Sequence, residues 1–263
     1  MIDLHTHTTY SRHATPSIEE SVVEAINKDV NILAITDHAP LSFDQENRLQ
    51  ESELQEYIDK IKELQKKYYE RILVLAGLEA DFFEEDFEYI KNVIPKHDLD
   101  YVIGSIHFIR HNNAIIKVWE YGGIDKNIFA KKYFDALEKM ICTGIYDSIG
   151  HPEYIYLWEV EDALIYDYFK KLTPYIKKYN MSYEINISLL KKMMVFKNNS
   201  KIEQNINIRI IELLASAGVP FVLGSDAHQK EKIGEYTDII YNLLKNNNVN
   251  LVYYRNRTKY ICN

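Results

Sequence analysis

The chain has 263 residues, 46% of them hydrophobic and 27% charged, which is typical of a globular protein with a large core. A formal net charge of −8 argues against broad electrostatic binding to nucleic acid or to an anionic membrane surface. The two cysteines do not lie in a metal-binding or redox motif, which argues against a disulfide framework. The sequence shows neither a membrane-spanning stretch nor a secretory signal, so we expect a cytoplasmic protein.

Short β-branched runs alternate with amphipathic segments along the chain. Strands are expected at 1–5, 31–36, 72–80, 100–107, 146–151, 182–187 and 220–225. One helix is expected to begin at Ser17, where Glu20 completes a capping-box pattern. Further helices are expected over 51–70 and near 127–142, 160–179, 203–217 and 235–246. We expect 41–52 to be an active-site loop, whereas 247–263, with one strand-like piece LVYY, has no assigned place.

This alternation predicts a parallel sheet, because parallel strands need crossover helices to connect them. About seven strand–helix units either form an open, doubly wound sheet or close into a barrel, and no GxGxxG motif follows an early strand to favour the dinucleotide-binding version. We therefore expect one α/β barrel domain over residues 1–263, with functional side chains at the C-terminal ends of its strands.

Metal-ligating side chains gather at these strand ends. In chain order they are His5, His7 and His13; Asp37 and His38; Glu79 and Asp81; His107; His151; Glu184 and Asn186; and Asp226 and His228. Each motif alone is weak, because histidines often make ordinary hydrogen bonds. Together, however, they would place many imidazoles and carboxylates at one end of the barrel, which is costly unless cations bind there.

The residues are too numerous for one ion, and they could fill two or three sites. Paired divalent ions can activate water and bind a phosphoryl oxygen. With no thiolate in the cluster and no nucleophilic triad, the set favours metal-assisted hydrolysis, with a phosphoester as the expected substrate class.

The ordered motifs DLHTHT, TDHAPLSF, GLEAD, LDYVIGSIHF, DSIGHP, YEIN and VLGSDAH, over about residues 1–245, resemble the polymerase and histidinol phosphatase (PHP) family. TDHAPL, GSIHF and LGSDAH further resemble its histidinol-phosphate phosphatase branch. The resemblance implies a distorted TIM-like (β/α)7 barrel and two to three divalent ions of zinc, manganese or iron. It also implies hydrolysis of L-histidinol phosphate by a metal-activated hydroxide, in L-histidine biosynthesis.

Position by position, the resemblance implies three groups of ligands. One ion would be held by His5, His7, Glu79 and Asp226. A second would share Glu79 and use His107 and His151, and a third would use His13, His38 and His228.

The sequence departs from this branch at two places. Ser11-Arg12 stands where the branch often has Cys-Pro. INISLLKKMMVFK stands where the branch often has a Thr-Ser-Gly-Leu-Arg-like stretch, so that Lys191 and Lys192 replace its arginine. A lysine contacts phosphate without the bidentate fork of arginine, which bears on substrate identity more than on reaction class.

The remaining roles are hypotheses. We expect Asp37, Glu79, Asp226 and His228 to act in catalysis, with strand-end hydrogen bonding as the alternative for Asp37. Candidates for phosphate contact are Arg12, Arg110, Lys191 and Lys192, and candidates for the leaving-group pocket are Phe43 and Phe108. The expected partner is a small phosphate monoester, with no membrane and no long nucleic acid. The alternatives are a PHP phosphoesterase for nucleotides or single-stranded DNA ends and a non-enzymatic metal-binding protein.

Overall fold

The computed structural model describes residues 1–120, 123–198, 201–205, 207–247 and 249–262. Its main sheet is parallel, with the strand order β1-β2-β3-β4-β7-β8-β9. The strands are β1 (Ile2–Asp3), β2 (Ile32–Ile35), β3 (Leu73–Asp81), β4 (Tyr101–Ser105), β7 (Ser148–Ile149), β8 (Ser182–Asn186) and β9 (Phe221–Gly224). They lie within the seven predicted segments or one residue beyond them.

The sheet closes between its first and last strands. The amide of Leu4 donates to the carbonyl of Leu223 at 2.8 Å, and the amide of Asp226 donates to the carbonyl of His5 at 2.7 Å. The expected distorted (β/α)7 barrel is therefore confirmed, and the C-terminal ends of all seven strands meet at one end of it.

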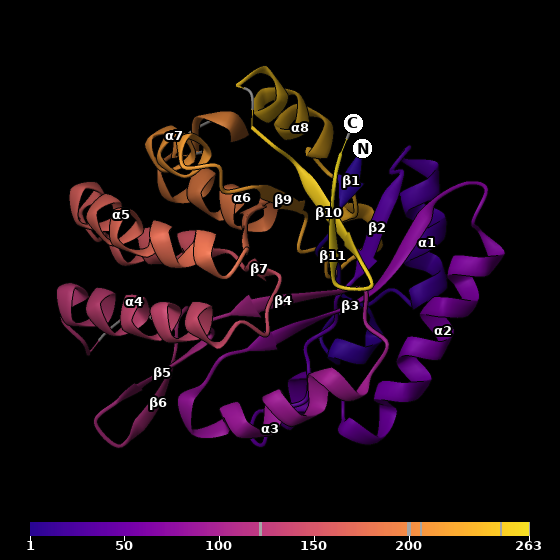
Figure 1. Ribbon diagram of the computed structural model, residues 1–263, viewed down its shortest axis with the longest axis horizontal. Helices are drawn as coiled ribbons and strands as arrows, with labels where there is room; N and C mark the ends of the chain where they lie inside the picture. The colour runs from indigo at the N-terminus through magenta and orange to yellow at the C-terminus, as the bar shows by residue number, and fades with distance from the viewer. Residues whose placement is uncertain (121–122, 199–200, 206, 248, 263) are drawn as a thin grey trace.

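Helices surround the strands (Figure 1). They are α1 (Ile18–Asn27), α2 (Leu54–Lys67), α3 (Phe87–Val93), α4 (Lys126–Thr143), α5 (Asp162–Lys178), α6 (Ile187–Phe196), α7 (Ile208–Ser216) and α8 (Thr237–Asn246). The predicted capping box is present, since Ser17 and Glu20 exchange hydrogen bonds at the start of α1. The short α3 and α6 were not predicted. In the described part of the chain, no helix combines the length and apolar character needed to cross a bilayer.

Two hairpins lie outside the barrel sheet. In the first, β5 (Phe108–His111) and β6 (Ala114–Lys117) pair antiparallel directly after β4, so that β6 ends at the rim of the barrel. The second consists of β10 (Val252–Arg255) and β11 (Thr258–Ile261), and β10 contains the strand-like piece seen in the sequence.

The hairpin β10–β11 covers the N-terminal ends of the strands (Figure 1, yellow). The Tyr254 hydroxyl donates to the carbonyl of Asp147 at 2.8 Å, just before β7, and the amide of Asn256 donates to the Asp100 carboxylate at 3.0 Å, just before β4. This end of the barrel is therefore closed by the chain itself, and the opposite end carries the candidate site.

Candidate metal centre

Four side chains form a compact set at the C-terminal ends of β1, β3 and β9. His5 Nε2 lies 3.1 Å from His7 Nε2, 3.4 Å from Glu79 Oε2 and 3.8 Å from Asp226 Oδ1. His7 Nε2 lies 3.4 Å from Glu79 Oε2 and 3.3 Å from Asp226 Oδ1. Two atoms that each lie about 2.0–2.1 Å from one tetrahedral zinc are about 3.3 Å apart. His5, His7 and Glu79 are therefore close enough to share one ion, and Asp226 lies 3.3–3.8 Å from both imidazoles as a candidate fourth ligand.

A second set shares Glu79 through its other oxygen. Glu79 Oε1 lies 2.6 Å from His151 Nε2 and 3.5 Å from His107 Nε2, and these two nitrogens are 3.1 Å apart. The Ser105 hydroxyl donates to the same oxygen at 2.7 Å. The Glu79 carboxylate thus faces one ligand set with each oxygen, which is the geometry of a bridging ligand.

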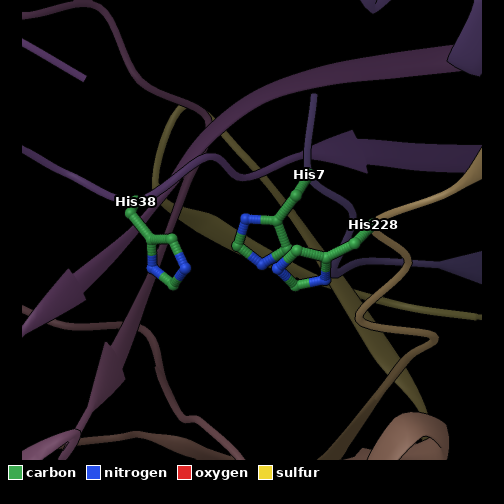
Figure 2. A group of neighbouring side chains, drawn as sticks. All are labelled: His7, His38 and His228. Carbon is green, nitrogen blue, oxygen red and sulfur yellow. The ribbon is translucent and has the colours of Figure 1, made fainter. Parts of the chain in front are cut away.

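A third group lies at the outer side of His7. His13 Nε2 and His228 Nε2 are 3.0 Å apart, and the His13 ring stacks on the His38 ring with centroids 5.2 Å apart. Figure 2 shows the His7 and His228 rings together on one side and the His38 ring on the other, with ligand nitrogens of all three within 4.8 Å of one another. His38 also contacts Glu79, the residue shared by the first two sets, since its Nδ1 lies 2.9 Å from Glu79 Oε2.

The donor set fits divalent cations. Three pairs of imidazole nitrogens face each other at 3.0–3.1 Å, and the buried Nδ1 of His151 has no hydrogen-bond partner among the described residues. Buried polar nitrogens without donors or acceptors are costly, and cation binding to imidazole lone pairs removes that cost.

Neighbouring groups hold most of the imidazoles through their other nitrogen, which leaves Nε2 free to ligate. His5 Nδ1 lies 2.5 Å from Glu184 Oε1, His107 Nδ1 lies 3.0 Å from Asp81 Oδ1, and His7 Nδ1 lies 3.0 Å from Ser11 Oγ. The other Glu184 oxygen accepts from the His151 amide at 2.5 Å. Glu184 therefore orients two ligand residues on neighbouring sides of the centre.

The local backbone conformation also helps to position the candidate ligands. Asp226 and His151 both have positive φ angles, 54° and 28°, which are uncommon for non-glycine residues. Gly224, at the end of β9, lies so close to the centre that a Cβ there would be 2.4 Å from His5 Cβ and 2.7 Å from Glu184 Oε1. Only glycine fits at that position without moving a ligand.

Asp37 does not reach the centre. It is fully buried and accepts four hydrogen bonds, from the backbone and hydroxyl of Thr8 at 2.7 Å each and from the backbone and hydroxyl of Ser11 at 3.0 and 2.6 Å. These contacts fit the strand-end hydrogen bonding given as the alternative, and a catalytic role of Asp37 stays a prediction. Asp37 is a positioning residue that holds Ser11, which in turn contacts His7.

The histidines of the metal-free cluster fall into two kinds: the pKa values of His7 and His38 are lowered, whereas nearby carboxylates outweigh burial and raise those of His5 and His107. Burial, followed by the nearby His228 and His38 rings, lowers the pKa of His7 to about 3. Burial also lowers the pKa of His38 to about 4, against the opposing pull of Glu79. Burial opposes ionisation of Glu79 as well, but the imidazoles of His5, His107 and His38 outweigh it and hold its pKa well below the ordinary range.

His107 behaves in the opposite way. Burial disfavours its charge, but the carboxylates of Asp81 and Glu79 outweigh burial and raise its pKa to about 9. His107 therefore carries a proton at neutral pH in the metal-free protein, and a cation must displace that proton on binding.

A pocket of about 460 Å³ opens onto these ligands. Its lining includes ligands from all three groups, and its walls consist of Asp44, Asn47, Arg48, Lys117, Trp119, Tyr154, Ser188 and Lys192. The expected active-site loop, 41–52, thus supplies one wall, and the hairpin β5–β6 and the start of α6 supply the others.

Of the four basic residues expected to contact phosphate, only Lys192 lines this pocket. Lys191 lies in an adjoining pocket and pairs with Glu235 at 2.6 Å. Arg12 pairs with Glu53, and Arg110 pairs with Glu85 at 2.9 Å at another surface groove. These three cations are neutralised by acidic neighbours outside the pocket.

The two phenylalanines expected to line the leaving-group pocket also lie elsewhere. Phe43 and Phe108 pack edge to face with centroids 5.0 Å apart, and Phe43 packs against Phe83 in the same way. The aromatic walls of the pocket are instead Trp119 and Tyr154. Trp119 follows a hairpin that the sequence did not reveal, and Tyr154 lies three residues after a predicted ligand, His151.

The sequence profile of the PHP domain matches residues 3–188. This chain belongs to the PHP family. Among relatives of this PHP chain, a "probable histidinol-phosphatase" of Clostridium acetobutylicum is 29% identical over 98% of both chains. Another of the same name from Deinococcus radiodurans is 28% identical over 89% of this chain and 88% of the relative.

A solved structure shares the PHP fold. The histidinol phosphate phosphatase of Lactococcus lactis, in complex with zinc, L-histidinol and phosphate, superposes with a TM-score of 0.81 at 19% identity, over 100% of this chain and 98% of the other. The barrel described above is thus a PHP barrel along its whole length.

Replacing Glu184 with glutamine is expected to weaken metal binding by about 10–100-fold, the usual cost of losing a partner that orients a ligand. The glutamine keeps the shape but loses the charge that faces His5 Nδ1 at 2.5 Å. Competition with a chromophoric chelator on stripped protein measures this affinity.

The matched control is Glu153→Gln, because burial raises the pKa of the Glu153 carboxyl to about 8, so that it is largely protonated at neutral pH. Equal losses in the two variants would mean that burial, not orientation of His5, explains the effect.

Proposed function

We propose that this chain is a metal-dependent phosphatase that hydrolyses L-histidinol phosphate to L-histidinol and inorganic phosphate. The observation that carries the proposal is the division of the Glu79 carboxylate between two ligand sets beneath a pocket of about 460 Å³. Two relatives that match 89–98% of the chain bear the name histidinol-phosphatase. The proposal includes a role in L-histidine biosynthesis, a cytoplasmic location and a single domain over residues 1–263.

The proposed ligands are His5, His7, Glu79 and Asp226 for one ion, Glu79, His107 and His151 for a second, and His13, His38 and His228 for a third. When bound, divalent ions such as zinc, manganese or iron supply Lewis-acid stabilisation of a phosphoryl group and lower the pKa of a water. Asp226 and His228 act here as ligands, and Glu79 fixes the spacing of the first two sets.

Lys192 is proposed to bind the substrate phosphate at the mouth of the centre. Its Nζ donates to the Tyr154 hydroxyl at 2.6 Å, and the Tyr154 ring packs edge to face on His151 with centroids 5.1 Å apart. Among the described residues no carboxylate pairs with Lys192, whereas Lys191 pairs with Glu235. Lys192 thus has a positive charge available for an anion beside the second ligand set.

Lys192→Met is expected to lower kcat/KM for L-histidinol phosphate by about 10–100-fold, the value of one hydrogen bond to a charged group. Lys191→Met, the adjacent lysine on the same helix, is the matched control and is expected to change kcat/KM by less than about twofold. Steady-state phosphate release measures both. A larger loss in Lys191→Met than in Lys192→Met would reverse the assignment of the two lysines.

The function itself is tested by phosphate release from L-histidinol phosphate, AMP and an aryl phosphate, with protein reloaded with zinc or manganese. We expect rapid release from L-histidinol phosphate that is lost with chelator. Release from AMP alone would indicate a nucleotide phosphoesterase, and bound metal without release from any ester would indicate a metal-binding protein without this activity.

A further inference from the structure

A lysine ammonium lies between a carboxylate and an indole ring on the wall of the pocket. Lys117 Nζ lies 3.9 Å from Asp44 Oδ1 and 5.8 Å from the centroid of the Trp119 ring. Asp44 comes from the segment between β2 and α2, whereas Lys117 and Trp119 come from the end of the hairpin β5–β6. All three line the pocket that opens onto the ligands.

This arrangement has the chemistry of a cation site. The face of an indole attracts ammonium groups, and a fixed carboxylate beside it adds a charge partner. Asp44 is held in place, because Asn47 Nδ2 donates to its Oδ1 at 2.7 Å and Arg48 donates to its Oδ2 at 3.1 Å. Its side chain is only 11% exposed, and its φ of 55° is one that aspartate tolerates better than most residues.

Two cationic side chains, Arg48 and Lys117, face Asp44. Arg48 is shared between Asp44 and Asp81, whose Oδ2 accepts from both terminal guanidinium nitrogens at 3.2 Å. Asp81 also has His107 Nδ1 at 3.0 Å from its Oδ1, and Lys117, at 3.9 Å, is the more distant of the two cations beside Asp44. The Lys117 side chain is 36% exposed at the end of a hairpin, so it can turn to solvent at little cost.

The cation site adjoins the ligands. The Trp119 ring packs edge to face on His107 with centroids 5.6 Å apart, and His107 belongs to the second ligand set. A phosphate ester bound at the ligands would therefore share its pocket with Asp44 and Trp119. L-Histidinol carries its amine on the carbon next to the one that bears the ester oxygen.

We propose that Asp44 and Trp119 form the subsite that binds the ammonium group of the leaving alcohol, and that the Lys117 ammonium occupies this subsite until substrate displaces it. This inference rests on the proposed function and names the residues that select its substrate. The subsite favours phosphate monoesters of amino alcohols over esters of the same size without the amine.

The kinetic test compares L-histidinol phosphate with 3-(imidazol-4-yl)propyl phosphate, which lacks only the amine and the stereocentre that carries it. We expect the protein to prefer the amino ester by at least about tenfold in kcat/KM. Asp44→Asn and Trp119→Leu are each expected to reduce this preference to within about threefold by slowing the amino ester alone.

Lys117→Met separates the proposed role from its main alternative. Removal of the internal competitor is expected to lower KM for the amino ester by about threefold or more and to leave the desamino ester unaffected. If Lys117 instead bound the phosphate, Lys117→Met would raise KM for both esters equally, and the proposal would be overturned. Lys131→Met, whose side chain is 67% exposed on α4, controls for the loss of one positive charge.

A binding measurement keeps the subsite testable without turnover. L-Histidinol and 3-(imidazol-4-yl)propan-1-ol are titrated into chelator-treated protein, and fluorescence of Trp119 is followed in a Trp158→Phe background, since these are the two tryptophans of the chain. Tighter binding of L-histidinol, lost in Asp44→Asn, supports the subsite. Equal binding of the two alcohols overturns it. Absence of phosphate release from both esters would instead contradict the proposed function.

Discussion

Glu79→Gln is expected to reduce phosphate release by about 10³-fold or more, because loss of a bridging charge removes several kcal/mol of metal-dependent stabilisation. Each oxygen of Glu79 faces a different ligand set, Oε2 toward His5 and His7 and Oε1 toward His107 and His151. A neutral amide cannot offer two anionic oxygens, and its NH2 group places a donor where an ion would bind.

Metal content and activity are measured on the same preparation, by elemental analysis and by phosphate release. Glu79→Gln is expected to retain fewer ions per chain than the unaltered protein, and Glu153→Gln, which replaces a buried carboxyl outside the ligand sets, is expected to retain them all. Full metal content with full activity in Glu79→Gln would show that the two sets do not share this residue.

Removal of bound metal is expected to lower the melting temperature by about 10–30 °C. An ion present at 100 times its Kd stabilises the fold by about 2.7 kcal/mol, and two or three ions act together. For a chain of this size, each kcal/mol corresponds to about 2–4 °C. The ligands come from strands at opposite ends of the sequence, so that ions are expected to bind the folded chain far more tightly than the unfolded one.

The pKa values of the histidines determine how the stability of the metal-free protein depends on pH. In the metal-free protein the pKa of His107 is raised from 6.5 to about 9, so its stabilising contribution is complete below pH 6.5 and is lost as the pH rises through 9. The pKa values of His7 and His38 are lowered to about 3 and 4, so these residues destabilise the fold as the pH falls from 6.5 toward those values.

The metal-free protein is therefore expected to be most stable near pH 6.5–7. The stabilisation by bound metal is expected to increase as the pH rises, because protons no longer compete with the ion for His107. Calorimetry with and without chelator at pH 5.5, 7 and 9 measures the difference. A stabilisation by metal that is the same at all three values would contradict the proton assigned to His107.

Sequence patterns predicted the barrel because its strands are buried on both faces and end in polar residues. β3 illustrates this, since an apolar run over 72–80 appears as a buried strand over Leu73–Asp81 that carries Glu79 to the centre near its C-terminal end. The convergence of the candidate ligands was predictable for the same reason, because strand ends of a parallel barrel converge whatever the loops do. His5 and His7 share one face because side chains alternate along extended backbone.

The residues that form the pocket walls could not be predicted from the sequence, because they are brought together by contacts between distant segments. Lys191 and Lys192 are neighbours in sequence, but successive residues on a helix point about 100° apart, so the packing of α6 decides which one faces the pocket. Asp37 stands beside His38 in the sequence, but its hydrogen-bond donors, Thr8 and Ser11, come from another strand end. Trp119 depends on a hairpin whose exposed residues alternate too weakly to predict a strand pair.

The closed seam between β1 and β9 has a consequence for the order of assembly. His13 and His228 lie 215 positions apart in the chain, and His5 meets Asp226 only when these two strands come together. A nascent or partly folded chain without β9 has no complete first ligand set, so metal uptake is a late event in maturation. Exchange of the Leu4 and Asp226 amide hydrogens reports how often this seam opens in the mature protein.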